Sequence, residues 1–308
     1  MKKVLIFGVG GFVGPYLAQE FKDADYEVYG SDIVKGERLQ EWVSFYEADL
    51  LNAGVVYSII HEIQPDIIIN LAAISSVGQS WKIPQKTIEV NIVGTLNILE
   101  SVKTMDKMPK VLLIGSSEEY DISEKPISET TILRANNPYG ISKVAQERFA
   151  NIYKVQYGIQ IYYVRAFNHT GIGQKDTFVL PSFCKQAAEI EKLGKPGVIK
   201  VGNLIAKRDF GHVKDLMRAY RLIVESPYCD TVYNVGSGKA HSLREMLNYI
   251  VSLCSQPIKI EVDPERVRPI DNPVICCDYS KIKSELGWSP QYNVFDALKE
   301  MFDYYMAQ

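Results

Sequence analysis

Short, largely apolar runs recur along the first half of the chain, and amphipathic stretches with helical spacing separate them. The runs cover residues 4–7, 27–31, 45–50, 66–73, 110–114 and 159–164. Apolar runs of this length without polar alternation are typical of strands buried on both faces. Residues 88–102 show a helical periodicity. The alternation predicts an α/β fold with a doubly wound, parallel, Rossmann-like sheet.

The clean alternation fades after about residue 167, where turn-forming residues become frequent. We therefore predict a first domain over residues 1–167 and a smaller, mixed C-terminal domain over residues 168–308 that binds the substrate. The strand-like run 232–235 is expected to return to the main sheet, so that the first domain regains about residues 212–236.

Composition narrows the class of protein and of partner. The 308 residues are 46% hydrophobic and 23% charged, with a net charge of −3, as in ordinary globular proteins. This balance gives no reason to expect nucleic acid or a membrane surface as a partner. No apolar run reaches the roughly 18 residues of a membrane span. The five cysteines show no metal-ligand spacing, so we expect no metal and a reducing, cytoplasmic location.

A glycine turn follows the first strand and precedes an amphipathic stretch. Gly8, Gly11 and Gly14 give a G-x-x-G-x-x-G spacing that lets the backbone approach a pyrophosphate at a helix N-terminus. Asp32 ends the second strand, where a carboxylate accepts the ribose hydroxyls of adenosine and repels a 2′-phosphate. The pattern predicts a dinucleotide site that favours NAD(H). NADP(H) stays an alternative cofactor because the cationic residues Lys35 and Arg38 are nearby in the sequence.

Tyr139 and Lys143 lie four residues apart, one turn from each other on a helix. An ammonium close to a phenol favours the phenolate, so such a pair can exchange a proton with a carbonyl or alcohol oxygen. Chance alone yields about 1.5 such pairs in a chain with 19 Tyr, and Tyr139 therefore needs supporting context. A second pair, Tyr279 and Lys283, is interpreted as a solvated helix start. Ser116, at the end of another predicted strand, supplies a third polar partner for the first pair.

With these motifs the whole chain resembles the extended short-chain dehydrogenase/reductases. The resemblance implies that Tyr139 is the acid/base, that Lys143 lowers its pKa and holds the nicotinamide ribose, and that Ser116 hydrogen-bonds the substrate oxygen. This chain departs from the family pattern at Asn70, where many relatives have histidine. Cofactor contacts are expected at Gly8, Gly11, Phe12, Val13, Gly14, Asp32, Asp49, Leu50, Leu71, Ala72, Ala73, Asn91, Tyr139 and Lys143.

The second half of the chain narrows the resemblance to the sugar-nucleotide branch that acts on GDP-hexoses. The segments that carry it are 165–171, 178–179, 201–210 and 268–269. Arginine forks suit the oxygens of a diphosphate. His169 and the other histidines are interpreted as structural. Substrate contacts are expected at Ser117, Glu118, Asn168, Phe178, Val179, Val201, Arg208 and Arg268.

The resemblance favours reduction of the C4 ketone of a GDP-4-keto-6-deoxy-hexose. Glu118, two residues after Ser116, lies where GDP-mannose 4,6-dehydratases carry a catalytic glutamate, so dehydration is the main alternative. UDP-hexose 4-epimerisation is a further alternative, and a cofactor-binding scaffold without turnover is the non-enzymatic one. The family also implies a homodimer through the helices around 91–105 and 139–156.

Overall fold

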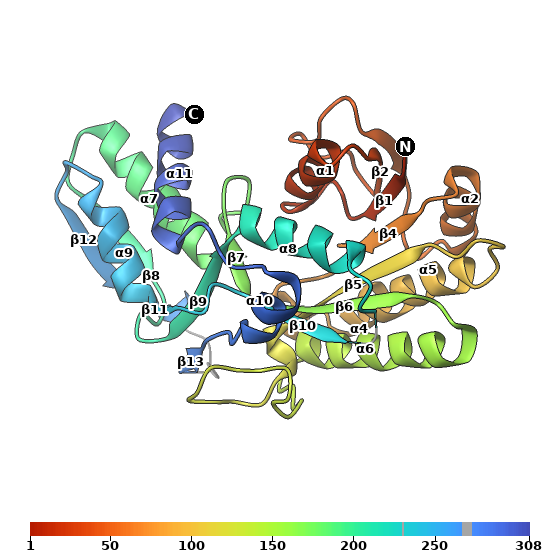
Figure 1. The fold of residues 1–308 in the computed structure, drawn as a ribbon. Helices are drawn as coiled ribbons and strands as arrows, with labels where there is room; N and C mark the ends of the chain where they lie inside the picture. The colour runs from red at the N-terminus through yellow and green to blue at the C-terminus, as the bar shows by residue number, and fades with distance from the viewer. Residues whose placement is uncertain (230, 267–272) are drawn as a thin grey trace.

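A seven-stranded, wholly parallel sheet forms the centre of the larger part of the molecule (Figure 1). The structure is a computed structural model that describes residues 1–229, 231–266 and 273–308. In spatial order the strands are β10 (Val232–Val235), β6 (Ile161–Ala166), β5 (Lys110–Ser116), β4 (Ile67–Asn70), β1 (Lys3–Phe7), β2 (Glu27–Asp32) and β3 (Ser44–Glu47). The direction of winding reverses between β1 and β4, and ligands bind at the carboxyl ends of strands beside such a point. The predicted fold class is confirmed.

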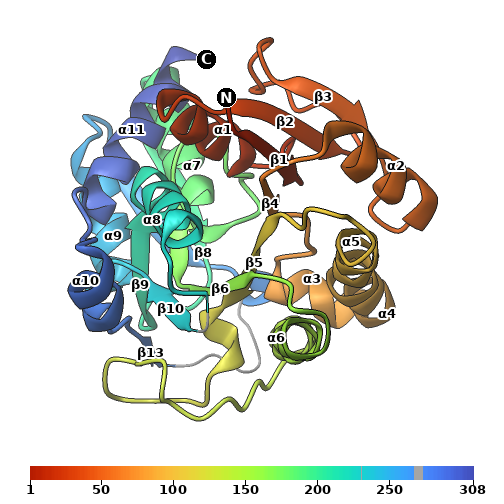
Figure 2. The same cartoon turned by 45° about the vertical axis from the view of Figure 1, so that its right-hand side comes forward.

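Helices cover both faces of this sheet, as Figure 2 shows. Along β1, Val4 and Ile6 pack into one core and Leu5 and Phe7 into the other, which explains the uninterrupted apolar run. The first core is completed by α1 (Gly14–Asp23) and α8 (Val213–Glu225). The second is completed by α2 (Ala53–Ile63), α5 (Gly94–Val102) and α6 (Pro138–Tyr157).

Several predicted bounds differ from the observed ones. β3 and β4 are shorter than the runs 45–50 and 66–73, because the chain turns out of the sheet at their carboxyl ends. β5 and β6 run further than predicted, since Gly115 pairs with Arg165 and Ser116 with Ala166. Ser116 and Arg165 are polar residues within these strands, and an apolar pattern therefore predicts the end of each strand too early.

The predicted helix 88–102 is not a single α-helix. It comprises the end of α4 (Pro84–Ile88), a π-helical turn, η1 (Glu89–Val93), and α5, and α3 (Val77–Lys82) precedes them. A π-helical turn inside a helix often marks a functional site. Asn91 lies in this turn, facing the start of α6.

The second half of the chain builds a smaller lobe with its own apolar core. Its helices are α7 (Val179–Leu193), α9 (Leu243–Ser252) and α11 (Val294–Ala307), which share one core cluster. Figure 1 shows these three helices together, away from the large sheet. Two small sheets accompany them: β8 (Gly197–Val201) with β12 (Ile258–Val262), and β11 (Ala240–Ser242), β9 (Lys207–His212) and β13 (Val274–Ile275), with β7 (Asn168–Thr170) also paired to β9.

The remaining described elements are short. They are the 3₁₀ turns η2 (Ser117–Glu119) and η3 (Pro264–Arg266) and the helix α10 (Ser280–Leu286). Among the described residues, no helix is long and apolar enough to cross a membrane. The domain bounds 1–167 and 168–308 stay a proposal, although β10 lies at the edge of the large sheet beside β6.

Candidate active site

The glycine turn joins β1 to α1 through very close backbone contacts. A Cβ on Gly8, whose φ is +80°, would lie 2.5 Å from the backbone nitrogen of Ala72, and one on Gly14 would lie 2.0 Å from the Val9 carbonyl oxygen. The fold itself therefore requires these two glycines. A Cβ on Gly11 would meet the Gly8 carbonyl oxygen at 3.3 Å and, apart from its own neighbours in the chain, no other atom of the described residues within 4 Å. The fold requires the middle glycine less, which fits a position reserved for the approach of a ligand.

The first turn of α1 is suited to an anion. Val13 precedes the helix and makes no side-chain hydrogen bond to it, and the first turn holds no acidic residue. The N–H groups at this end therefore keep their partial positive charge for a phosphate. Phe12, in the glycine turn just before α1, stacks on His169, with ring centroids 6.0 Å apart. The turn thus contacts β7, which begins at the predicted substrate residue Asn168.

Asp32 is bonded directly to the glycine turn. Its carboxylate accepts the N–H of Gly10 at 3.0 Å and that of Ile33 at 2.7 Å. Burial raises the pKa of Asp32 above its ordinary value, while the two backbone bonds act in the opposite direction. Two carboxylate oxygens offer about four acceptor positions, so further bonds to ribose hydroxyls remain available.

The two cations near Asp32 have protein partners. Lys35 pairs with Glu41 at 3.2 Å. The Arg38 guanidinium donates to the Ile172 carbonyl oxygen at 2.6 Å and lies over the Tyr16 ring, 4.8 Å from its centroid. Arg38 thus connects the loop after β2 to the loop after β7.

The other expected cofactor residues fall into two groups. Leu71, Ala72 and Ala73 follow β4 and lie against the glycine turn, since the backbone of residues 71 and 72 surrounds the Cβ position of Gly8. Asp49 and Leu50 follow β3. Asp49 accepts the N–H of Leu51, and Leu50 is buried, with its side chain against Gly94.

The side-chain amide of Asn91 makes three hydrogen bonds within the protein. Its amide oxygen accepts the Ile74 N–H at 2.8 Å, and its amide nitrogen donates to the Ile74 carbonyl and to the Ser142 hydroxyl. These bonds indicate a structural role, in which Asn91 links the loop after β4 to α6. A direct contact between Asn91 and a cofactor stays a prediction.

Tyr139 and Lys143 project from the first two turns of α6, beside the end of β5. The helix begins here because Asn137 caps it, accepting the Gly140 N–H at 2.9 Å, and Pro138 occupies its first position. Both candidate side chains are buried, and the Lys143 ammonium lies 5.9 Å from the centroid of the Tyr139 ring. Ser116 ends β5 and contacts the Tyr139 phenol. The structure therefore brings the three predicted catalytic residues together.

Electrostatics of the pair differ from the sequence-based expectation. Burial raises the pKa of Tyr139 well above its ordinary value, and the hydrogen bond with Ser116 opposes this rise. Burial also lowers the pKa of Lys143 to about 8. The Lys143 ammonium donates to the Ile114 carbonyl at 2.7 Å and to Gln146 at 2.9 Å, so these two groups, rather than the phenol, accept its hydrogen bonds. The raised pKa of Tyr139 favours the neutral phenol, which is the form that donates a proton.

Ser117 and Glu118 follow Ser116, the candidate catalytic serine. The Ser117 hydroxyl is buried and has no hydrogen-bond partner among the residues that the structure describes. Such a group is costly unless a ligand satisfies it. Glu118 is half-buried and accepts a hydrogen bond from the Asn137 side chain at 2.8 Å. Its carboxylate thus lies beside the cap of α6.

The expected substrate residues of the smaller lobe are less uniform. Phe178 and Val179 form the half-buried start of α7, and Asn168 is half-buried on β7. Arg208 on β9 is buried and donates to the Lys207 carbonyl. The expectation for Val201 is not supported for its side chain, which is fully buried in the core of this lobe. Arg268 lies outside the described residues.

Two further outcomes concern residues that the sequence interpretation misjudged. Tyr279 is the N-cap of α10, so the predicted helix start is right, but its side chain is half-buried and packs edge-on against Trp288, with ring centroids 5.8 Å apart. A buried ionic cluster behind Ser116, made by Glu119, Glu147 and Arg165, went unpredicted. Its signals were the S-x-x-E capping-box pattern from Ser116 to Glu119 and an arginine inside a buried strand.

Comparisons with known proteins identify the family to which this chain is similar. A family model described as GDP-mannose 4,6 dehydratase matches residues 5–301. The GDP-6-deoxy-D-mannose reductase of Pseudomonas aeruginosa is 28% identical over 301 residues, covering 97% of this chain and 95% of the relative. The GDP-mannose 4,6 dehydratase 2 of Arabidopsis thaliana is 31% identical over 323 residues, covering 98% and 86%.

Solved structures show the same fold with either nicotinamide cofactor. The structure of RMD from Pseudomonas aeruginosa complexed with NADPH superposes with a TM-score of 0.85 at 26% identity, covering 100% of this chain and 99% of that one. The Thermus thermophilus UDP-glucose 4-epimerase in complex with NAD gives a TM-score of 0.88 at 25% identity, covering 98% of each chain.

Proposed function

Since this chain belongs to the GDP-mannose 4,6-dehydratase family of NAD(P)-dependent nucleotide-sugar oxidoreductases, we propose that it reduces the C4 ketone of a GDP-4-keto-6-deoxy-hexose. The observation that carries this proposal is the buried Tyr139 phenol, which lies beside Ser116 and Lys143 at the carboxyl edge of the sheet. A neutral phenol in this place can donate the proton that a ketone needs when it becomes an alcohol.

Each of the three residues has a distinct task in this reaction. The Ser116 oxygen accepts the Glu118 N–H at 3.2 Å, which leaves its own O–H to polarise the ketone oxygen. Tyr139 donates its phenolic proton to that oxygen. Lys143, whose ammonium is held by the Ile114 carbonyl and Gln146, stabilises the phenolate that remains. The nicotinamide, when bound, supplies the hydride.

The residues around the glycine turn fit a dinucleotide, and we propose that NAD(H) is preferred. Asp32 is fixed by Gly10 and Ile33 at the end of β2, and the nearby cations Lys35 and Arg38 have protein partners. A 2′-phosphate would meet the Asp32 charge without a cation already directed at it. The reductase relative complexed with NADPH is the reason to test both reductants.

A GDP-mannose 4,6-dehydratase is the second candidate, because Glu118 places a half-buried carboxylate two residues from Ser116. That reaction oxidises C4 and then needs a second acid/base for the C5 proton and the C6 hydroxyl. The hydrogen bond from Asn137 holds Glu118 near the cap of α6, on the side of the catalytic pair. The same carboxylate would thus be essential to a dehydratase and dispensable to a reductase.

One assay separates the candidates. The protein is supplied with GDP-mannose alone, and separately with the GDP-4-keto-6-deoxy sugar plus NADH or NADPH. Oxidation of the reductant with the keto sugar only is the expected result. Keto-sugar formation from GDP-mannose without added reductant would identify a dehydratase. If UDP-glucose is turned over and neither GDP sugar is, both GDP proposals are wrong and the protein is an epimerase.

Replacing Glu118 tests the same distinction within the site. For a reductase, Glu118→Gln should keep kcat within about threefold, because glutamine retains an acceptor for the Asn137 amide. For a dehydratase the same change should lower kcat by about 10² or more. Glu124→Gln, a change of an exposed carboxylate in the following loop, is the control.

A further inference from the structure

Glu119 lies directly behind the catalytic serine and is fully buried. One of its carboxyl oxygens accepts the backbone N–H of Ser116 at 2.7 Å and lies 3.4 Å from the Tyr163 hydroxyl. The turn closes on itself, since the Ser116 hydroxyl accepts the Glu118 N–H. Hydrogen bonds with residues of η2 thus fix both the backbone and the side chain of Ser116. Glu119 makes the bond to the backbone.

The Arg165 guanidinium makes its shortest contacts with groups other than Glu119. Arg165 forms a bidentate pair with Glu147, with N–O distances of 2.9 and 2.7 Å, and donates to the Tyr120 hydroxyl at 2.8 Å. Its separation from the second Glu119 oxygen is 3.8 Å, and that oxygen has no hydrogen-bond partner among the described residues. An ionised carboxylate so placed is costly, and a proton removes the cost. Burial, and next the Glu147 charge, raise the pKa of Glu119 to about 8.

Other titratable groups surround Glu119 on two elements. They are Tyr139, Lys143 and Glu147 on α6 and Tyr163 and Arg165 on β6. A negative charge on Glu119 would raise the pKa of both Tyr139 and Lys143. The charge state of Glu119 therefore bears directly on the catalytic pair.

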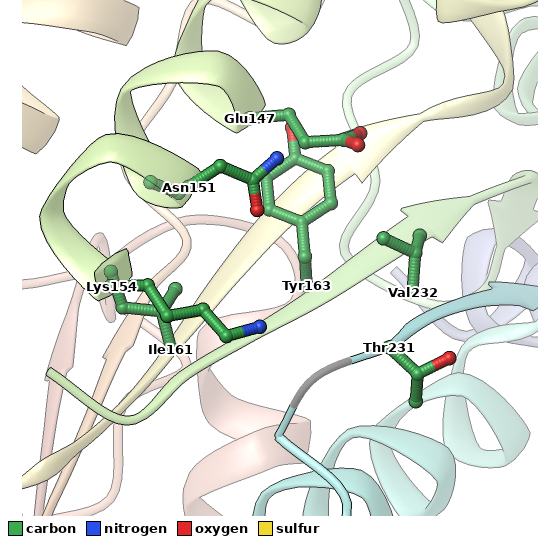
Figure 3. A pocket seen from close by; sticks show the side chains of 8 residues that line it. Glu147, Asn151, Lys154, Ile161, Tyr163, Thr231 and Val232 are labelled. Atoms are coloured by element: carbon green, nitrogen blue, oxygen red, sulfur yellow. The ribbon is translucent and has the colours of Figure 1, made fainter. Parts of the chain in front are cut away.

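The far side of the cluster reaches a small pocket between α6 and β6. Figure 3 shows Glu147 and Tyr163 side by side on its wall, with Asn151, Lys154 and Thr231 around them. Tyr163 also donates to the Lys143 carbonyl at 2.9 Å. Tyr163 therefore lines the pocket and also contacts Glu119 and the backbone of α6.

We propose that Glu119 is a positioning residue that works in its protonated form. The neutral carboxyl group fixes the Ser116 backbone through the N–H bond and keeps a second negative charge away from the Tyr139 phenol. That this serves ketone reduction rests on the function proposed above. That Glu119 takes up a proton on folding does not, and it can be tested without any substrate.

The first test separates the acceptor oxygen of Glu119 from its charge. Glu119→Gln keeps an acceptor for the Ser116 N–H and stays neutral, so kcat at pH 7 should remain within about threefold of the parent. Glu119→Leu removes the acceptor, so kcat should fall about tenfold or more while the dissociation constant for NADH is unchanged. If both variants lose kcat equally, the ionised carboxylate is required and the proposal is wrong.

The second test detects the proton on Glu119 through the pH dependence of the free energy of unfolding. A carboxyl group whose pKa is higher in the folded state binds more protons there, so stability falls as pH rises from about 4.5 to about 8. Urea unfolding should show the parent losing stability relative to Glu119→Gln across this window. Glu124→Gln, which changes an exposed carboxylate, should run parallel to the parent. Parallel curves for Glu119→Gln would overturn the proposal, and this result stands even if no keto sugar is turned over.

Discussion

Among single residues, Tyr139 shows how the position of a side chain sets its chemistry. The chain contains two Tyr–Lys pairs with the same spacing, at 139/143 and 279/283. The first lies buried beside Ser116, whereas Tyr279 packs on Trp288 and Lys283 is exposed. The two pairs have the same spacing, so only the residues that surround them distinguish one pair from the other.

Tyr139→Phe should lower kcat for keto-sugar reduction by about 10² or more, because the proton donor is lost. Binding of NADH, followed by fluorescence, should change little. The matched control is Tyr279→Phe, which removes the same hydroxyl from the other pair and should leave kcat unchanged. Full activity of Tyr139→Phe would refute the assigned role.

Asp32 supports a second prediction for a single residue. Asp32→Ala removes the negative charge at the end of β2, so the ratio of kcat/KM for NADH to that for NADPH should fall about tenfold. The ratio is measured from initial rates with each reductant. Glu37→Gln alters an exposed carboxylate of the following loop and should not change it. An unchanged ratio in Asp32→Ala would remove Asp32 from cofactor selection.

Among elements, the cap of α6 fixes the start of the helix that carries the proposed catalytic pair, Tyr139 and Lys143. Asn137 accepts the Gly140 N–H and also donates to Glu118, so one side chain joins the helix start to the turn after β5. Tyr139 and Lys143 occupy the turns that this cap orders. Their placement therefore depends on a residue that takes no part in the chemistry.

Asn137→Ala should cost about 1–2 kcal/mol of unfolding free energy, as the loss of an N-cap does, and should lower kcat about tenfold. Urea unfolding and steady-state kinetics measure the two effects. Asn293→Ala removes the cap of α11, in the smaller lobe, and should cost similar stability without the loss of kcat. Equal kinetic effects in both variants would show that stability alone is responsible.

For the molecule as a whole, we propose that the protein is a homodimer through α5 and α6. Ile141, Ile152 and Val155 on α6 are 53%, 56% and 86% exposed and lie on one face of the helix. Exposed apolar side chains gathered on one helix face favour association.

Sedimentation equilibrium should therefore give twice the 34.8 kDa chain mass. The double change Ile152→Glu and Val155→Glu should give monomers, because charges would enter an apolar contact. Leu193→Glu, at the exposed end of α7, should leave the assembly intact. A monomeric parent protein would contradict the dimer.

Neighbouring residues were enough to predict the local features of this protein. The glycine spacing and the runs of apolar residues predicted the α/β sheet and the residues that its carboxyl edge brings together. Tertiary structure decided what depends on burial and on distant partners. It turned the Lys143 charge toward Ile114 and Gln146, engaged Arg38 with Ile172, and enclosed Glu119 behind Ser116. Protonation and orientation follow from desolvation and long-range contacts, and no local pattern records either of these.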